Sequence, residues 1–139
     1  MTMNNNSFLD TNILIYAYSI SELNKKNKSI ELLNHKNIIL STQVINEFVW
    51  IMSRKYNVDL IKLDMIVKNL FDTYRIVLID KQVIELAIKL SIKYNFSYWD
   101  GLILSASLVN ECNIIYTEDL QHGQIIDNNL TILNPFTDC

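Results

Sequence analysis

Short runs of consecutive apolar residues alternate along this chain with longer segments whose apolar residues recur at helical spacing. Unbroken apolar runs of this kind are typical of strands buried on both faces, and amphipathic helices provide the cover that such strands need. The pattern therefore predicts an α/β fold with a parallel sheet covered on both sides. The expected strands are Ser7–Leu9, Ile38–Leu40, Ile76–Ile79, Asn113–Tyr116 and, fifth, Leu130–Leu133.

Six helices are expected between these strands. Ser41 or Thr42 is a suitable cap for the third helix, in which apolar residues recur from Val44 to Tyr56. In the fourth helix, Leu60, Leu63, Val67, Leu70 and Phe71 are expected to share one apolar side. The fourth helix is expected at 59–71. The first, second, fifth and sixth helices are expected at about 12–19, 25–34, 81–94 and 98–110.

The composition indicates one ordered domain spanning residues 1–139. Half of the residues are apolar, and only two glycines and one proline interrupt the chain. Cys112 and Cys139 are too few for a disulfide framework, which favours a reducing cytosol. The polar stretch Met1–Ser7 has no secretory signal pattern, and no apolar run approaches about 20 residues. We expect a soluble, cytoplasmic protein without a membrane segment.

Four acidic residues occupy positions where a carboxylate is either costly or useful. Asp10 directly follows the first strand and Asp119 closely follows the fourth, so both are expected at one edge of a parallel sheet. Glu47 lies in the second turn of the third helix, beside apolar positions, and Asp100 lies in the first turn of the sixth. Each has an ordinary alternative: a helix cap for Asp10, a first-turn acid for Asp100, the edge of an apolar face for Glu47, and a solvated loop for Asp119.

Four carboxylates in one crevice would repel one another unless a cation compensates them. Oxygen-only ligands suit the hard divalent ions Mg²⁺ and Mn²⁺, and such ions support phosphodiester hydrolysis. The net charge of −3 does not exclude a nucleic-acid substrate, because setting these four acids aside leaves −3 + 4 = +1. It does argue against binding through backbone charge alone.

Four sequence segments resemble motifs of the PIN-domain family, especially the VapC-like ribonuclease toxins. The first is a strand-ending aspartate followed by Thr11 and Asn12, and the second is a helix containing Glu47. The third is a Trp-Asp-small-apolar helix start at Asp100, and the fourth is a loop after the fourth strand. The matching segments are Phe8–Tyr18, Ser41–Phe48, Ser97–Ile103 and Tyr116–Gln121 with Gly123, and the closing Leu133–Phe136 is also similar.

The resemblance implies a three-layer α/β/α PIN fold with a five-stranded sheet. It also implies a metal-dependent endoribonuclease, in which Asp10, Glu47, Asp100 and Asp119 are the catalytic residues and ligate Mg²⁺ or Mn²⁺. The supporting groups that would orient these carboxylates are Thr11, Asn12, Thr117 and Glu118. Either Glu118 or Asp119 is the fourth ligand. Family resemblance further implies an RNA substrate, a cognate antitoxin protein of the VapBC type and a homodimer.

Several other side chains are candidates for contact with RNA. A solvated helix surface is the ordinary reading of the basic residues Lys25, Lys26, Lys28, Arg54 and Lys55, which could contact phosphates. Tyr98 and Trp99 could stack on bases, although we expect Trp99 in the core. His35 and His122 are lone histidines to which no catalytic role is assigned.

Three other functional classes fit the sequence less well. A PIN-like binding or signalling module without nuclease activity is the main alternative. A phospho-accepting receiver domain would need an acidic pair after the first strand and a lysine after the last, and neither is present. A dinucleotide-binding fold would need a glycine-rich phosphate loop, which two glycines cannot build.

Overall fold

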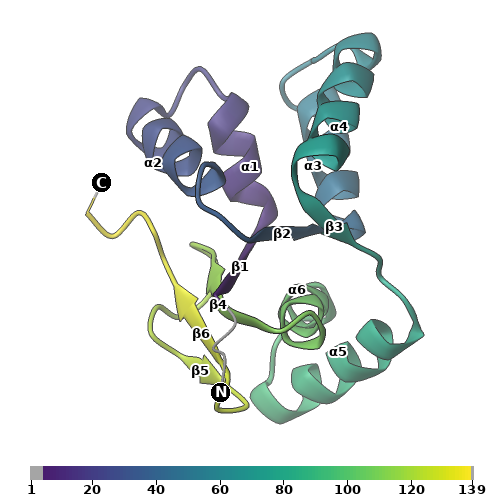
Figure 1. The fold of residues 1–139 in the computed structure, drawn as a ribbon, viewed down its shortest axis with the longest axis vertical. Helices are drawn as coiled ribbons and strands as arrows, with labels where there is room; N and C mark the ends of the chain where they lie inside the picture. Colours follow the sequence, from purple (N-terminus) through teal and green to yellow (C-terminus); the bar gives the residue numbers. More distant parts are fainter. Residues whose placement is uncertain (1–4, 139) are drawn as a thin grey trace.

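The computed structural model describes residues 5–138 and centres on one six-stranded sheet (Figure 1). The strand order is β3-β2-β1-β4-β6-β5, and every pairing is parallel except that of β5 with β6. The five predicted strands are all present. The strands are β1 (Asn6–Leu9), β2 (Ile38–Ser41), β3 (Arg75–Val77), β4 (Cys112–Tyr116), β5 (Ile125–Ile126) and β6 (Leu130–Leu133).

Helices cover both faces of the sheet and give three layers. The helices α1 and α2 lie on one side of the sheet and α5 and α6 on the other, while α3 packs against α1 and α4 (Figure 1). Most helices begin at a residue whose side chain accepts a hydrogen bond from the first turn, as the sequence predicts for Ser41. The helices are α1 (Thr11–Tyr18), α2 (Leu23–Leu33), α3 (Thr42–Arg54), α4 (Leu60–Thr73), α5 (Lys81–Tyr94) and α6 (Tyr98–Val109).

The strand order reverses between β1 and β4. The chain passes from β1 outward through β2 to β3, and then returns to place β4 and β6 on the opposite side of β1. In open α/β sheets, ligands bind beyond the carboxyl ends of the strands at such a reversal. Here the two strand ends are in register, because Leu9 pairs with Tyr116. Asp10 and Thr117 are therefore the first residues beyond the sheet at this point.

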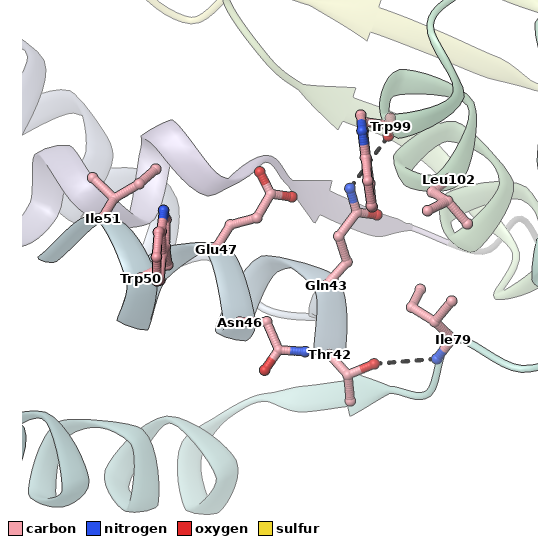
Figure 2. A pocket seen from close by; sticks show the side chains of 9 residues that line it. All are labelled: Thr42, Gln43, Asn46, Glu47, Trp50, Ile51, Ile79, Trp99 and Leu102. Atoms are coloured by element: carbon pink, nitrogen blue, oxygen red, sulfur yellow. Dashed lines mark hydrogen bonds between the residues drawn. The ribbon is translucent and has the colours of Figure 1, made fainter. Parts of the chain in front are cut away.

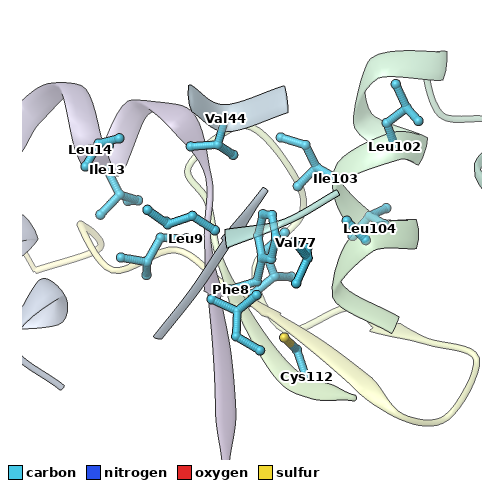
Figure 3. Packing of buried hydrophobic residues seen from close by; sticks show 14 of the residues in the cluster. Phe8, Leu9, Ile13, Leu14, Val44, Val77, Leu102, Ile103, Leu104 and Cys112 are labelled. Atoms are coloured by element: carbon cyan, nitrogen blue, oxygen red, sulfur yellow. The ribbon is translucent and has the colours of Figure 1, made fainter. Parts of the chain in front are cut away.

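The apolar core holds these strand ends in place. Phe8, Leu9 and Ile115 in the central strands are fully buried, as are Leu14 of α1 and Leu104 of α6. Figure 3 shows that buried side chains of β1, α1, α3 and α6 gather around the strands. Burial of such side chains is worth about 1.5–3 kcal/mol each, so the backbone beneath the site is firmly fixed.

The structure differs from the sequence-based prediction in the sheet and in α4. The third strand is Arg75–Val77 rather than Ile76–Ile79, and Leu78 is exposed beyond its end. The sheet gains a sixth strand, β5, which has two residues and pairs antiparallel with β6. In α4 only Leu63 and Leu70 are buried, whereas Leu60 and Phe71 are exposed, because α4 packs mainly against α3 and does not contact the sheet broadly.

The expectation about the cellular compartment rests on the two cysteines and the polar N-terminal stretch. Cys112 is a buried free thiol. Cys139 and residues 1–4 of the N-terminal stretch lie outside the described residues. Across residues 5–138, no helix has the length and apolar character that crossing a membrane would require.

Candidate active site

Asp10 is a buried carboxylate at the point where the strand order reverses. Only 9% of its surface is exposed. Its Oδ1 accepts a hydrogen bond from the Thr11 backbone N–H at 2.6 Å, and its Oδ2 accepts one from the Thr117 hydroxyl at 2.7 Å. Burial raises its pKa from 3.8 to about 6 despite these two bonds, and the charges of Asp119 and Glu47 raise it further. Asp10 therefore caps α1 and also lies in a crowded acidic environment.

Glu47 and Asp100 approach this environment from α3 and α6. Burial raises the pKa of Glu47, with further contributions from the charges of Asp100 and Asp119, while the nearby Gln43 side chain lowers it. The Glu47 Oε1 atom is buried and has no hydrogen-bond partner among the described residues. Asp100 is half-buried, and its backbone N–H donates to the Ser97 hydroxyl at 3.1 Å, which fixes the start of α6.

Asp119 lies in the loop that follows β4 and is more exposed than the other three acids. The Asn12 side-chain amide donates to Asp119 Oδ2 at 3.2 Å, and the Asp119 backbone N–H donates to the Thr117 hydroxyl oxygen at 3.2 Å. Thr117 thus links the two strand ends, because the same hydroxyl donates to Asp10. Burial raises the pKa of Asp119, as do the charges of Glu118 and Asp100, while Lys25 lowers it.

Glu118 points to a different set of partners. Its Oε2 atom forms an ion pair with Lys25 at 3.0 Å, and its Oε1 atom accepts a hydrogen bond from the Tyr16 hydroxyl. The Lys25 ammonium also lies 4.9 Å from the centroid of the Tyr16 ring and 5.5 Å from that of Phe136. The Glu118 charge is therefore compensated within the protein, whereas the charges of the four acids described above are not compensated in this way.

The four acids Asp10, Glu47, Asp100 and Asp119 form one electrostatic group. The charges of Asp119 and Glu47 raise the pKa of Asp10, and the charge of Asp100 raises the pKa of both Glu47 and Asp119. Within the part of the chain that the structure describes, no three Asp, Glu, His or Cys side chains are already gathered around one point as a metal site. Like-charged carboxylates repel one another, which opposes such gathering when no cation is bound.

The donor set nevertheless fits a hard divalent cation. All four side chains offer carboxylate oxygens, which Mg²⁺ and Mn²⁺ prefer, and no cysteine or histidine is among them. The unpaired, buried Glu47 Oε1 atom is an available ligand. Glu47 and Asp100 are on helices, so rotation about their side-chain torsions alone can redirect their oxygens.

A cleft of about 600 Å³ is lined by Glu47, the only one of the four acids that borders it. Figure 2 shows the Glu47 carboxylate in this cleft between the indole rings of Trp50 and Trp99. The Gln43 side-chain amide donates to the Trp99 carbonyl oxygen at 3.3 Å and so connects α3 to the start of α6. The cleft volume lies within the range of about 300–1,000 Å³ that is usual for ligand sites.

Two expectations from the sequence need correction. Trp99 does not lie in the core, since 65% of its surface is exposed, because its side chain lines the cleft from the first turn of α6. Lys25 lies at the surface of α2 but is only partly exposed, because Glu118, Tyr16 and Phe136 contact its ammonium group.

The remaining candidates are more dispersed. Lys28 pairs with Glu31 on the surface of α2, and Lys26 is half-buried on the same helix. Arg54 and Lys55 are exposed at the end of α3, where they line a second hollow. Tyr98 contacts the edge of the Trp99 ring.

Gln43, Trp50 and Tyr16 are site residues that the sequence analysis did not identify. Gln43 and Trp50 lie four residues before and three residues after Glu47, so helical spacing places all three on one side of α3. Tyr16 follows Asn12 by four residues and shares its side of α1 for the same reason. This spacing was available in the sequence once Glu47 and Asn12 had been singled out.

The fold has close counterparts among solved structures. A toxin–antitoxin complex from Klebsiella pneumoniae is 19% identical, covers 94% of this chain and 98% of its own, and gives a TM-score of 0.70. Mycobacterium tuberculosis VapC20, a sarcin–ricin loop cleaving toxin, is 12% identical over 82% of this chain and 92% of its own, with a TM-score of 0.67.

A third structure, VapBC2 from Rickettsia felis bound to a DNA fragment from their promoter, is 18% identical over 91% of this chain and 96% of its own, with a TM-score of 0.64. Comparison with curated protein sequences gave no match. The sequence itself matches the PIN domain family over residues 7–126, which is most of the chain. The chain therefore belongs to the PIN domain family.

Proposed function

We propose that this protein is a metal-dependent endoribonuclease that hydrolyses RNA phosphodiester bonds in the cytoplasm. The observation that carries the proposal is the buried Asp10 carboxylate, which the Thr11 N–H and the Thr117 hydroxyl hold within electrostatic reach of Asp119 and Glu47. Retaining buried, mutually repelling carboxylates is costly for a fold and is characteristic of sites that bind cations. The structural similarity to toxins, one of them described as a sarcin–ricin loop cleaving toxin, supports RNA as the substrate.

In this proposal Asp10, Glu47, Asp100 and Asp119 hold Mg²⁺ or Mn²⁺. When bound, such an ion supplies a Lewis acid for the negative charge that develops on the phosphate. Thr117 keeps Asp10 oriented through its hydroxyl, and Asn12 does the same for Asp119 through its amide. These two hydrogen bonds orient the Asp10 and Asp119 carboxylates toward a bound ion without a change in the backbone.

The contacts of Glu118 favour Asp119 as the fourth ligand. Both Glu118 oxygens are already engaged, one by Lys25 and the other by Tyr16. Releasing Glu118 would leave the Lys25 ammonium without its ion-pair partner in a partly buried position. We therefore assign Glu118 a positioning role, in which it anchors the loop that carries Asp119.

The proposed partners are a cognate antitoxin and a second copy of the chain. The similar structures from Klebsiella pneumoniae and Rickettsia felis are toxin–antitoxin assemblies, which supports a VapBC-type pair. A stripe of exposed isoleucines on α5, formed by Ile84, Ile88 and Ile92, supports a homodimer. A small neighbouring gene whose product has a DNA-binding N-terminus would support the toxin assignment.

The direct test is cleavage of RNA by the purified chain and by Asp10→Asn. The parent is expected to cleave in the presence of Mg²⁺ and not with excess chelator, and the variant is expected to be inactive. Asp64→Asn is the matched control, since Asp64 is an exposed acid on α4 that pairs with Lys68 away from the site. Equal cleavage by parent and Asp10→Asn would refute the assignment.

The substrate itself can be identified in cells. Sequencing RNA 5′ ends after brief induction of the parent, with Asp10→Asn as the reference, should reveal enriched cleavage positions in one class of RNA. If a folded parent chain produces no such positions and does not arrest growth, the alternative applies, and the chain is a PIN-fold binding module without nuclease activity.

A further inference from the structure

Two exposed indole rings flank the proposed metal site in a way that the hydrolysis itself does not require. Trp50 of α3 is 61% exposed and Trp99 of α6 is 65% exposed, although tryptophan is usually well buried. Both line the cleft that contains Glu47, one on each side of it (Figure 2). Figure 2 shows both rings nearly edge-on, so each presents a flat face toward the space around the carboxylate.

A second hollow adjoins the cleft at Trp50. It has a volume of about 590 Å³, shares Trp50 and Ile51 with the cleft, and is also lined by Asn12, Glu22, Arg54 and Lys55. Trp50 therefore borders both the cleft that contains Glu47 and a basic end formed by Arg54 and Lys55 on α3.

The basic end also combines cations with aromatic rings. The Arg54 guanidinium lies 4.5 Å from the centroid of the Trp50 ring, and the Lys55 ammonium lies 5.5 Å from that of Tyr56. Surfaces that bind single-stranded nucleic acid pair aromatic rings, on which bases stack, with cations that follow the phosphates. Arg54 and Lys55 have no acidic partner among the ion pairs of the described residues, so their charges are available to a polyanion.

We propose that Trp50 and Trp99 stack on unpaired bases on the two sides of the scissile phosphate, while Arg54 and Lys55 bind the phosphates of the strand beyond Trp50. The proposal rests on the ribonuclease function and defines its substrate as single-stranded or looped-out RNA. Bases within a duplex stack on each other and are not available to the two rings, so an A-form helix does not fit this slot.

The experiment measures RNA binding separately from cleavage. Full-length Asp10→Asn is titrated with a fluorescein-labelled, unstructured 12-nucleotide RNA in Mg²⁺ buffer, and with the same RNA annealed to its complement. Fluorescence anisotropy gives Kd, and tryptophan quenching reports stacking. The single strand is expected to bind more tightly than the duplex and to quench the indole fluorescence.

The rings are then changed one at a time in the Asp10→Asn background. Trp50→Leu and Trp99→Leu are each expected to raise Kd for the single strand by about 10-fold or more, while Trp50→Phe and Trp99→Phe largely retain binding. Phe71→Leu, which removes an exposed aromatic ring of α4 outside the cleft, is the matched control and should leave Kd unchanged. Circular dichroism establishes that each variant is folded.

Three results would overturn the inference. In the first, the leucine variants bind the single strand as tightly as their Asp10→Asn background. In the second, the duplex binds as tightly as the single strand. In the third, the leucine variants lose a co-purified protein partner but still bind RNA. The last result would assign the rings to protein docking. Cleavage by the parent chain is assayed in parallel: cleavage without ring-dependent binding refutes this inference alone, and ring-dependent binding without cleavage refutes the nuclease assignment alone.

Discussion

Asp10 is buried at the meeting point of β1 and β4, and its ionisation is therefore coupled to the stability of the fold. Because its pKa is raised from 3.8 to about 6 in the folded chain, Asp10 is protonated between these pH values in the folded state but ionised in the unfolded state. The stabilisation from neutral Asp10 is fully present below pH 3.8 and is lost as the pH rises through about 6. A shift of this size corresponds to about 3 kcal/mol.

Asp10→Asn is accordingly expected to be more stable than the parent at neutral pH, by up to about 3 kcal/mol in the absence of divalent cations. The difference in free energy of unfolding between variant and parent should grow between pH 4 and pH 7. Urea denaturation in chelator across this range measures it, with Asp64→Asn as a control whose difference stays flat. A pH-independent difference for Asp10→Asn would show that Asp10 has an ordinary pKa.

Thr117 is the residue that joins the two halves of the site. Its hydroxyl donates to Asp10 and accepts from the Asp119 backbone N–H, so Thr117→Val removes both contacts while preserving the shape of the side chain. We expect Mg²⁺ affinity to fall about 10- to 100-fold, which is typical when a group that orients a metal ligand is lost. The Mg²⁺ dependence of the melting temperature measures this directly.

Thr117→Ser is the matched variant, because it retains the hydroxyl and should restore most of the affinity. If valine and serine variants respond equally to Mg²⁺, the hydroxyl does not orient the ligands. The four acids were predicted from the sequence because each lies just after a strand or within the first two turns of a helix that the local pattern defines. The ion pair of Lys25 with Glu118 could not be predicted, because it joins residues 93 positions apart.

At the scale of elements, the close packing of α5 against α6 positions Asp100 and Trp99. A Cβ added to Gly101 would lie 2.7 Å from the Ala87 backbone oxygen and would also collide with the Ser91 hydroxyl. Backbone cannot move aside as a side chain can, so the two helices must separate. This contact gives a physical reason for the small residue that follows Asp100.

Gly101→Ala is expected to lower the free energy of unfolding by about 1–3 kcal/mol through overpacking, although alanine is the better helix former. Chemical denaturation measures the loss. The double variant Ser91→Ala with Gly101→Ala is the control for the side-chain clash, and it should remain destabilised because the Ala87 oxygen is still in place. Full recovery in the double variant would mean that the backbone contact is unimportant.

Most elements could be predicted because their signals are local. Caps such as Ser41 and Asp59, together with unbroken apolar runs, place helix and strand ends within a few residues of their positions in the structure. The two-residue strand β5 has no such signal, since it exists only through its pairing with β6. The exposure of Trp99 was not predictable either, because it depends on where α6 begins relative to the cleft.

At the scale of the whole molecule, the apolar stripe of α5 has no cover within the described chain. Ile88 is 48% exposed and Ile92 is 78% exposed, and helical spacing aligns them with Ile84. Such a stripe is costly in water and is characteristic of an interface between protein chains. It lies on the side of the molecule where α5 and α6 cover the sheet (Figure 1).

Ile88→Glu is expected to convert a homodimer to a monomer, because burying an unpaired carboxylate in an apolar interface costs more than the contact gains. Light scattering coupled to size-exclusion chromatography measures the mass. Ile61→Glu makes the same substitution at an exposed isoleucine of α4. It is the control and should leave the mass unchanged. A parent that is already monomeric at micromolar concentration would contradict the dimer.

The pairing of β1 with β4 also has a consequence for how the protein is made. Asp10 and the hydroxyl that orients it are separated by 107 residues, and the strands that bring them together are parallel neighbours formed from distant parts of the chain. A growing polypeptide that has not yet reached β4 carries Asp10, Glu47 and Asp100 but neither Thr117 nor Asp119. If the proposed nuclease function is correct, the emerging chain is harmless to the ribosome that synthesises it, and toxicity begins only after translation has passed the last of these residues.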